Sequence, residues 1–254
     1  MPGSSPCRVL RLAAAAALLS SLGGAARGAG LEISPTLVRL SPGETSAIVQ
    51  LRNGGAEEVR YQVQLTRWGE SPEGEMQLAP TQDVIVFPAL LALKPGEERN
   101  LRVGAAVGFG PVEKSYRLFL EELPPAQRPG AAAQVRVLSR IGIPIFLAPS
   151  RAEERPEIED LLVSGGRVAF ALRNRGTVHY RPAELRVSGL DASGAELFRW
   201  SFNPWYVLAG GERRYEHVIP AASCARVRKV TVESSAGGGV LVASRVTPDG
   251  ACAR

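Results

Sequence analysis

Residues 59–66 read Val59-Arg60-Tyr61-Gln62-Val63-Gln64-Leu65-Thr66, an unbroken alternation of apolar and polar side chains. Successive side chains of a β-strand point to opposite faces, so this pattern places the four apolar residues in a core and the four polar residues in water. An amphipathic helix would need a period near 3.6 residues, which this stretch lacks. It therefore predicts a half-buried strand, which Trp68 closes.

Short apolar runs of the same period flank this strand, and turn sequences such as Ser41-Pro42-Gly43, Asn53-Gly54-Gly55 and Lys94-Pro95-Gly96 separate them. About seven short strands with a turn every eight to twelve residues are typical of an immunoglobulin-like β-sandwich. Besides residues 59–68, the expected strands are 31–33, 49–51, 84–87, 101–103, 116–120 and 135–146.

The second half of the chain repeats this style. Alternating or apolar segments occur at 168–172, 185–187, 197–207, 213–219, 227–232 and 240–246, and no segment keeps a helical period. Residues 148–156, Ala-Pro-Ser-Arg-Ala-Glu-Glu-Arg-Pro, are charged and rich in proline, as linkers are. We therefore predict an all-β protein of two immunoglobulin-like sandwich domains set at an angle, residues 31–148 and 157–254, joined by a linker at 149–156.

The first thirty residues have the pattern of a secretory signal peptide. Residues 1–11 carry two arginines and no acid, and the apolar run Leu12–Leu22 is followed by small residues at 23–30. A run this short does not reach the roughly twenty residues that span a membrane. A tethering helix is the alternative interpretation. No later stretch is apolar for long enough, so we expect secretion without stable membrane insertion.

Charge argues against a nucleic-acid partner. The chain has a formal net charge of +5, and loss of the three arginines in residues 1–30 lowers it to +2. The remaining arginines are scattered, whereas phosphate binding needs a concentrated basic face.

Two cysteines remain after removal of the signal peptide, Cys224 and Cys252. An even pair in an oxidising compartment predicts one disulfide. The alternative, a metal site, would need histidines at ligand spacing, and neither His179 nor His217 has that spacing. We therefore predict a disulfide and no metal.

The inventory for catalysis is also poor. Neither histidine lies beside a recognisable nucleophile or acid, and Gly237-Gly238-Gly239 has the setting of a hairpin turn and not of a phosphate-binding loop. The sequence predicts no enzyme and no cofactor.

Four patches of the first half occur together in a recognisable order. They are Ile33-Ser34-Pro35 leading to Leu40-Ser41-Pro42-Gly43, Val86-Phe87-Pro88 leading to Leu93-Lys94-Pro95-Gly96, residues 116–124 (Tyr-Arg-Leu-Phe-Leu-Glu-Glu-Leu-Pro) and residues 140–146 (Arg-Ile-Gly-Ile-Pro-Ile-Phe). This half resembles the PapD family of periplasmic pilus chaperones, particularly the archaic or alternative branch that serves spore-coat-U-like pilins. The second half matches only in size, strand density and its late cysteine pair.

The resemblance implies a periplasmic chaperone that binds, stabilises and delivers pilus subunits to an outer-membrane usher, as part of fimbrium biogenesis and cell wall organization. In such chaperones the last strand of the first domain completes a pilin that lacks its own final strand, a known case of strand addition. Here that strand is 133–146. The preceding loop, 124–132, has the composition of a mobile segment, which would let the start of the strand become ordered on the subunit. The candidate donor residues of the strand are Ala133, Val135, Val137, Ser139 and Ile141.

Two readings of this strand stay open on sequence alone: Val135 and Val137 could also be ordinary sandwich core. An exposed apolar edge is an aggregation hazard that a partner would cover. Self-association of the free protein is one way to cover it, and a pilin-like subunit is another.

The basic pair with which the family clasps the subunit's C-terminal carboxylate is missing, because Val38 and Pro144 occupy the two positions. Arg140 is the candidate anchor, since a guanidinium binds a carboxylate with two hydrogen bonds. A solvated strand residue or an internal salt bridge is the competing interpretation of Arg140. Arg102 and Lys114 are lesser candidates.

A second function from another class remains, a secreted two-domain adhesion or binding module. Trp200, Trp205 and Tyr206 could contact a sugar or a protein, although aromatic residues of a sandwich more often fill its core.

Overall fold

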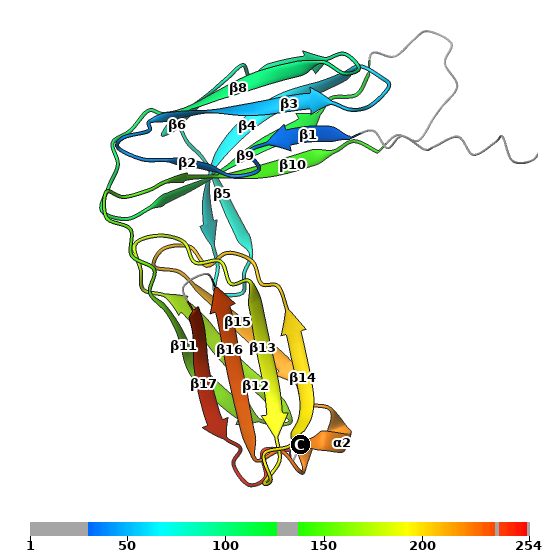
Figure 1. Ribbon diagram of the computed structural model, residues 1–254, viewed down its shortest axis with the longest axis vertical. Helices are drawn as coiled ribbons and strands as arrows, with labels where there is room; N and C mark the ends of the chain where they lie inside the picture. The colour runs from blue at the N-terminus through cyan, green and yellow to red at the C-terminus, as the bar shows by residue number, and fades with distance from the viewer. Residues whose placement is uncertain (1–29, 126–136, 237–238, 253–254) are drawn as a thin grey trace, which may run out of the picture.

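The structure, a computed structural model, describes residues 30–125, 137–236 and 239–252. Within these ranges every regular element is a strand except the short helix α2 (Ala221–Cys224), which confirms the all-β class. Figure 1 shows two groups of strands set at an angle, β1–β10 above and β11–β17 below. None of the helical segments in the described ranges has the length and apolar character needed to cross a membrane.

The first group forms a sandwich of two sheets. One has the order β1-β3-β8-β6, and the other has the order β2-β10-β9-β4-β5, with β7 also paired to β4. The strands are β1 (Leu31–Ser34), β2 (Val38–Leu40), β3 (Ser46–Asn53), β4 (Val59–Glu70), β5 (Met76–Pro80), β6 (Val84–Phe87), β7 (Leu90–Leu93), β8 (Glu98–Ala105), β9 (Lys114–Glu122) and β10 (Arg140–Leu147).

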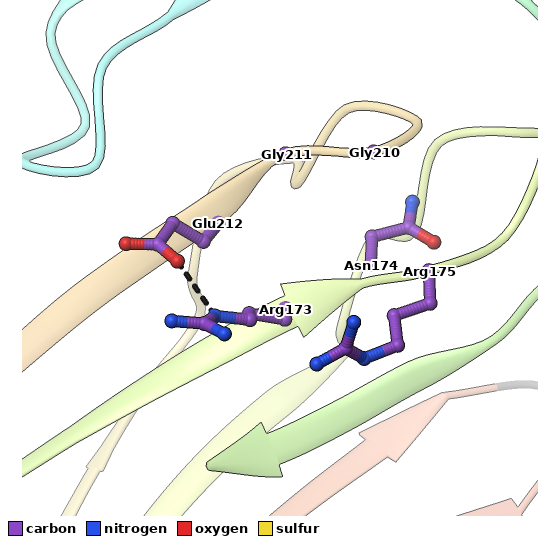
Figure 2. Close-up of a pocket in the computed structure, with 6 residues that line it drawn as sticks. All are labelled: Arg173, Asn174, Arg175, Gly210, Gly211 and Glu212. Atoms are coloured by element: carbon purple, nitrogen blue, oxygen red, sulfur yellow. Dashed lines mark hydrogen bonds and ion pairs between the residues drawn. The ribbon is translucent and has the colours of Figure 1, made fainter. Parts of the chain in front are cut away.

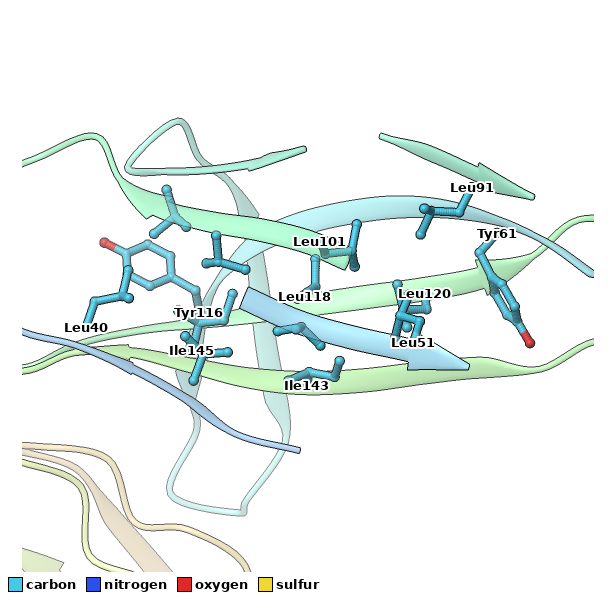
Figure 3. Packing of buried hydrophobic residues seen from close by; sticks show 14 of the residues in the cluster. Leu40, Leu51, Tyr61, Leu91, Leu101, Tyr116, Leu118, Leu120, Ile143 and Ile145 are labelled. Carbon is cyan, nitrogen blue, oxygen red and sulfur yellow. The ribbon is translucent and has the colours of Figure 1, made fainter. Parts of the chain in front are cut away.

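The core of this sandwich lies between the two sheets, where alternate side chains of facing strands meet. Figure 3 shows Leu51 of β3 and Leu101 of β8 against Leu118 of β9 and Ile143 of β10. All four are buried. The alternation at residues 59–66 positions β4 as expected, with Tyr61 in this core.

The second group forms a smaller sandwich from a three-stranded sheet, β11-β12-β15, and a four-stranded sheet, β14-β13-β16-β17. Its core includes Phe170, Leu185 and Val230. The strands are β11 (Pro156–Ser164), β12 (Arg167–Asn174), β13 (Glu184–Leu190), β14 (Glu196–Phe202), β15 (Glu212–Val218), β16 (Lys229–Ala236) and β17 (Gly239–Val246).

Several strands differ from the expectation. The expected strands do not include β2, β5, β7 or β11. The strand expected at 197–207 is also too long, because β14 ends before Asn203-Pro204. A proline has no N–H for the ladder, so it ends the strand there. The last strand of the first sandwich begins at Arg140, and the expected strand residues 137–139 are outside it. β10 ends at Leu147 and β11 begins at Pro156, and the exact domain limits stay a prediction.

The predicted disulfide is confirmed, because Cys224 and Cys252 are bonded to each other. Cys224 lies at the end of α2, not in a strand, and Cys252 follows β17 near the end of the chain. The bond closes the end of the second sandwich that is remote from the first (Figure 1). Both cysteines belong to or pack against its hydrophobic core.

Candidate functional site

The outer edge of β10 is only half covered. β9 pairs with β10 over the whole of Arg140–Leu147, whereas β2 pairs only with Ile145–Leu147, in parallel. Within the described residues, the other half of this edge, Arg140–Pro144, therefore has no neighbouring strand. Pro144 lies in this half, as expected for a residue that cannot donate to a ladder. Main-chain groups of Arg140–Ile143 on this side are available to an added strand.

The predicted donor residues do not form one exposed row. Ala133 and Val135 lie outside the described residues. Val137 is 88% exposed. Ser139 donates from its backbone N and its Oγ to Oε2 of Glu122, at 3.2 and 2.9 Å. Ile141 is half-buried against the sandwich core.

Arg140 is held by its cross-strand neighbour. Its Nε is 2.7 Å from Oε1 of Glu121, and its guanidinium lies 4.0 Å from the ring centre of Phe119. This is the internal salt bridge that the sequence left open. Arg140 is also seven residues from the end of β10 that leads to the second sandwich, about 23 Å along an extended strand. Its role as an anchor stays a prediction.

The two lesser candidates lie on different surfaces. Arg102 is exposed on β8, between Ile48 of β3 and Phe87 of β6, on the sheet that does not contain β10. Lys114 is the first residue of β9, opposite Leu147, and its Nζ donates to the carbonyl of Gly108 at 3.2 Å. Only Lys114 is near the junction of the two sandwiches.

That junction has an apolar centre. Trp68 of β4 and Phe146 of β10 pack on Tyr206 and Leu208 of the second sandwich, and all four are buried. The Trp68 and Tyr206 rings meet edge to face with centroids 5.6 Å apart. The junction therefore has the burial of a core and not of a loose linker contact.

Polar contacts surround this centre. Oε1 of the buried Glu113 accepts from the backbone N of His179 at 2.9 Å and lies 2.7 Å from Nδ1 of its ring. The His179 ring stacks on Phe146 at 3.8 Å. On the other side the β4–β5 hairpin reaches the second sandwich, where Arg214 N donates to the carbonyl of Pro72 at 2.8 Å. His179 is thus a structural residue of the junction.

Sequence reasoning missed Arg117, the most unusual residue of the junction. It is 3% exposed, and its Nε and Nη2 have no partner among the described residues. The guanidinium lies 3.9 Å from the ring centre of Trp68 and 5.0 Å from that of Trp205. Burial lowers its pKa. The signal was an arginine inside the apolar run 116–120.

Arg117 faces the junction from the middle of β9, where it pairs with Thr66 of β4 and with Pro144 of β10. It is therefore next to the half of β10 that has a free edge. Glu70 lies nearby, and burial raises the pKa of its carboxyl to about 7, against the lowering effect of Arg213 and Arg117. A cleft of about 390 Å³ opens here, lined among others by Trp68, Glu70 and Lys114.

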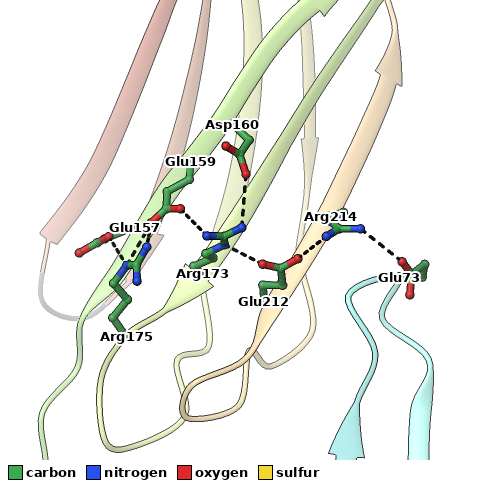
Figure 4. A network of polar contacts seen from close by, with 8 residues as sticks. All are labelled: Glu73, Glu157, Glu159, Asp160, Arg173, Arg175, Glu212 and Arg214. Carbon is green, nitrogen blue, oxygen red and sulfur yellow. Dashed lines mark hydrogen bonds and ion pairs between the residues drawn. The ribbon is translucent and has the colours of Figure 1, made fainter.

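A second pocket, of about 320 Å³, belongs to the second sandwich (Figure 2). Arg173 and Arg175 line it, but their charges are already compensated: Arg173 contacts Glu159 at 2.8 Å and Glu212 at 2.6 Å. Figure 4 shows that these pairs belong to a chain of ion pairs that ends on Glu73 of the β4–β5 hairpin. This pocket is a structural feature of the sheet surface.

The comparisons with known proteins agree with this geometry. Residues 30–153 match the family model of the pili and flagellar-assembly chaperone, PapD N-terminal domain. The first sandwich therefore belongs to the PapD-like pilus-assembly chaperone family. Members of this family are not enzymes, which confirms the prediction that the chain has no catalytic function. No curated protein matches the chain.

Solved structures of PapD-like chaperones share the fold of both sandwiches. The CsuC chaperone in its complex with the tip adhesion subunit CsuE, from the archaic Csu pili of Acinetobacter baumannii, is 21% identical, with a TM-score of 0.57 over 87% of this chain and 100% of that one. The class 5 fimbriae chaperone CfaA is 14% identical, with a TM-score of 0.56 over 86% and 100%. The YadV chaperone is 13% identical, with a TM-score of 0.55 over 85% and 98%.

These identities establish the fold and no more. The two immunoglobulin-like domains are confirmed in this way, and the archaic branch stays a prediction. Among the described residues, the first sandwich thus offers two features for function: the half-free edge of β10, and the buried Arg117, whose Nε and Nη2 have no partner there.

Proposed function

We propose that the protein is a periplasmic chaperone that binds pilus subunits by donor-strand complementation and delivers them to an outer-membrane usher. The observation that carries the proposal is the free half of the β10 edge in a chain of the PapD-like family. An incomplete pilin would add to Arg140–Ile143, where main-chain hydrogen bonds give affinity that is independent of side chains. No nucleotide is required, because the exchange of one strand for another drives delivery.

Val137 is the apolar side chain that the pairing would bury. Val137 is exposed in the free protein and lies three residues before Arg140, where the free edge begins. In an extended strand its side chain would share one face with those of Ser139 and Ile141, because alternate residues point to the same side. An exposed valine beside an open edge is costly to leave uncovered, and a client groove offers the cover. The same contact keeps the client from aggregating through its own open groove.

We propose that Arg117, and not Arg140, binds the C-terminal carboxylate of the subunit. Burying a guanidinium whose Nε and Nη2 have no hydrogen-bond partner among the described residues costs free energy. A carboxylate would accept a hydrogen bond from each of the two nitrogens. Trp68 and Trp205 hold the guanidinium plane in place before the ligand arrives. Trp68, against which the Arg117 guanidinium lies, lines the cleft of about 390 Å³, and this cleft gives room for the last residues of a client.

The adhesion-module alternative has less support. Tyr206 is buried in the junction, and Trp200 stacks on His217 and Phe202 against the core of the second sandwich. Trp205 is partly exposed, but its ring lies next to Arg117. These aromatic residues are therefore occupied by packing, and no row of them faces solvent.

Co-expression with a pilin-like client of the same organism tests the donor strand. We expect a soluble one-to-one complex, and Val137→Asp should reduce recovery of the client at least tenfold without unfolding the chaperone. Val218→Asp is the matched control, because Val218 is an exposed valine of the second sandwich. Equal client yield with Val137→Asp and Val218→Asp would contradict the donor-strand assignment.

Arg117→Lys and Arg140→Lys separate the two candidate anchors. Lysine keeps the charge but loses the planar pair of donors, so the variant at the true anchor should lose client affinity by about tenfold or more. Affinity for a client lacking its free C-terminal carboxylate should be the same for wild type and variant. If only Arg140→Lys weakens binding, Arg117 is not the anchor.

A further inference from the structure

Met76 and Leu78 form an exposed apolar strip along β5. They are 42% and 40% exposed, and alternation places both side chains on one face of the strand. Leu78 is the partner of Trp68 on β4, and Met76 is the partner of Glu70. Because directly opposite residues of a ladder share a face, the apolar strip lies on the same face of the sheet as Trp68.

The charged end of Arg117 lies on this face as well. Its guanidinium is 3.9 Å from the ring centre of Trp68. Opposite residues have Cβ atoms about 5 Å apart, so Leu78 is next to the residue that supports the guanidinium. The guanidinium, whose Nε and Nη2 have no partner among the described residues, therefore has an apolar surface beside it.

The second sandwich contributes a further apolar side chain to this place. Trp205 is 44% exposed, and its ring centre is 5.0 Å from the guanidinium of Arg117. Figure 1 shows that β5 belongs to a hairpin that extends from the first sandwich to the second. There Nη2 of Arg213 donates to the carbonyl of Gly74 at 2.6 Å. This contact holds the hairpin at the junction, so the apolar strip and Trp205 border the same guanidinium.

Polar side chains next to the apolar strip offer little to a ligand. Burial raises the pKa of the carboxyl of Glu70, opposite Met76, to about 7, so it carries less than a full charge at neutral pH. Oγ1 of Thr66, on the same face, already donates to the carbonyl of Arg117 at 3.5 Å. A polar ligand side chain would therefore lose water here without a strong partner, whereas an apolar one would bury exposed surface.

We propose that this surface selects the last residue of the client, and that a large apolar side chain at that position packs on Met76, Leu78 and Trp205. The carboxylate of the same residue pairs with Arg117. Charge complementarity identifies the occupant as a chain end, because an aspartate or glutamate side chain would supply the anion but no apolar group. The inference rests on the proposed function for its ligand, a pilus subunit, and adds the residue type that the site accepts.

Titration of the purified protein with short peptides, followed by NMR, tests the site without a folded client. The probes are an acetylated hexapeptide of glycine and serine that ends in phenylalanine, the same peptide ending in serine, and the C-terminal amide of the first. We expect the phenylalanine peptide to bind about tenfold more tightly than the serine peptide. The amide should bind at least tenfold more weakly, because it cannot form the ion pair with Arg117.

Leu78→Ser should remove the preference for phenylalanine and leave the affinity of the serine peptide unchanged. The matched control is Leu162→Ser, because Leu162 is a leucine of β11 that is 47% exposed. This control should keep the preference, and the NMR spectra should show that both variants are folded.

Three results would overturn the proposal. One is equal affinity, or no binding, of the phenylalanine and serine peptides. Another is a preference for phenylalanine that Leu78→Ser retains as fully as Leu162→Ser does. The third is equal binding of the amide and the free carboxylate, which would also remove Arg117 as the anchor.

The peptide results and the co-expression results with Val137→Asp fail separately. A client that forms the expected complex while the peptides show no preference would overturn the selection of the last residue alone. Peptides that show the preference while no client is ever bound would overturn the chaperone function and leave the selective site in place.

Discussion

The two sandwiches are variations on one plan, and a single asparagine shows it most directly. Asn53 ends β3 and Asn174 ends β12, in Leu51-Arg52-Asn53-Gly54-Gly55 and Leu172-Arg173-Asn174-Arg175-Gly176. Each Nδ2 donates to two backbone carbonyls at 2.7 and 3.0 Å, and each Oδ1 accepts from the glycine N–H two residues on at 2.9 Å. Both side chains are buried.

The sheets agree as well. The order β10-β9-β4-β5 of the first sandwich corresponds to β17-β16-β13-β14 of the second, and β1-β3-β8 corresponds to β11-β12-β15. The difference lies in what each adds to the plan. The first adds β6, β7 and β2, of which β2 pairs with β10, and the second adds the disulfide between Cys224 and Cys252. The two sandwiches thus share one arrangement of strands, and they differ in the added strands of the first and the disulfide of the second.

The largest effect should come from the disulfide, which only the second sandwich has. Replacing both cysteines by serine releases a loop with a sequence separation of 28 and should cost about 3.5 kcal/mol of unfolding free energy through chain entropy. We expect this cost in the unfolding of the second sandwich alone. Urea unfolding followed by hydrogen exchange of each half measures it. An equal loss of protection in the first sandwich would show that the two halves unfold as one unit.

The two asparagines give the next largest effect and test the shared plan itself. Alanine leaves two carbonyls and one N–H without the side-chain partner, so Asn174→Ala should cost about 3 kcal/mol of stability. Asn53→Ala should cost about 1 kcal/mol less, because one of its acceptors, the carbonyl of Glu57, is only partly buried and water can replace the amide. Unfolding by urea measures both. A neutral Asn53→Ala would mean that the motif is shared in form only.

A strand could be predicted from the sequence where residues close to it in the chain determine it, and could not where its partner is distant in the chain. The alternation at residues 59–66 predicts β4, because strand faces are set by neighbours in the chain. The cysteine pair likewise predicts its bond. Val38–Leu40 forms β2 only because β10 lies beside it, and nothing within three residues indicates this.

The candidate site shows the same limit. The free half of β10 follows from where β2 stops, which is a fact of tertiary structure. Arg140 is in a strand with the expected alternation, yet the direction of β10 places it far from the junction. Arg117 is in the apolar run that carried the family resemblance, but its burial between Trp68 and Trp205 depends on residues that are distant in the chain. Pattern alone could not choose between the two arginines.

The pH dependence of stability that comes from Glu70 tests whether the junction between the two sandwiches contributes to the stability of the fold. Burial raises the pKa of its carboxyl in the folded protein to about 7, above its ordinary value of 4.5, so the folded state binds the proton more tightly. The stability from this group is complete below pH 4.5 and is lost as the pH rises through 7. After solvent screening we expect about 2 kcal/mol.

Urea unfolding between pH 5 and pH 8 measures this loss. Glu70→Gln should remove that part of the pH dependence, because glutamine stays neutral. Glu159→Gln in the second sandwich is the control, since nearby arginines lower the pKa of that carboxyl. A slope that Glu70→Gln leaves unchanged would contradict the role of Glu70 at the junction.

The smallest effect concerns the arginine that precedes each asparagine. Arg52 contacts Glu32 and Glu98 at 3.1 and 3.6 Å, and both partners are on the neighbouring strands. Arg173 contacts Glu212 and Glu159 in the same way, at 2.6 and 2.8 Å. Exposed ion pairs contribute little, so Arg52→Ala should cost under about 0.5 kcal/mol.

Arg173→Ala should cost more, about 1 kcal/mol, because its side chain is less exposed and belongs to the chain of ion pairs in Figure 4. High salt should reduce the Arg52 effect further and the Arg173 effect less, since screening acts first on exposed charges. Equal costs at low salt that vanish together at high salt would show that both arginines are plain surface pairs. The chain of ion pairs around Arg173 would then add no stability beyond that of separate surface pairs. The contact of Glu73 in the β4–β5 hairpin with Arg214 would likewise not stabilise the junction.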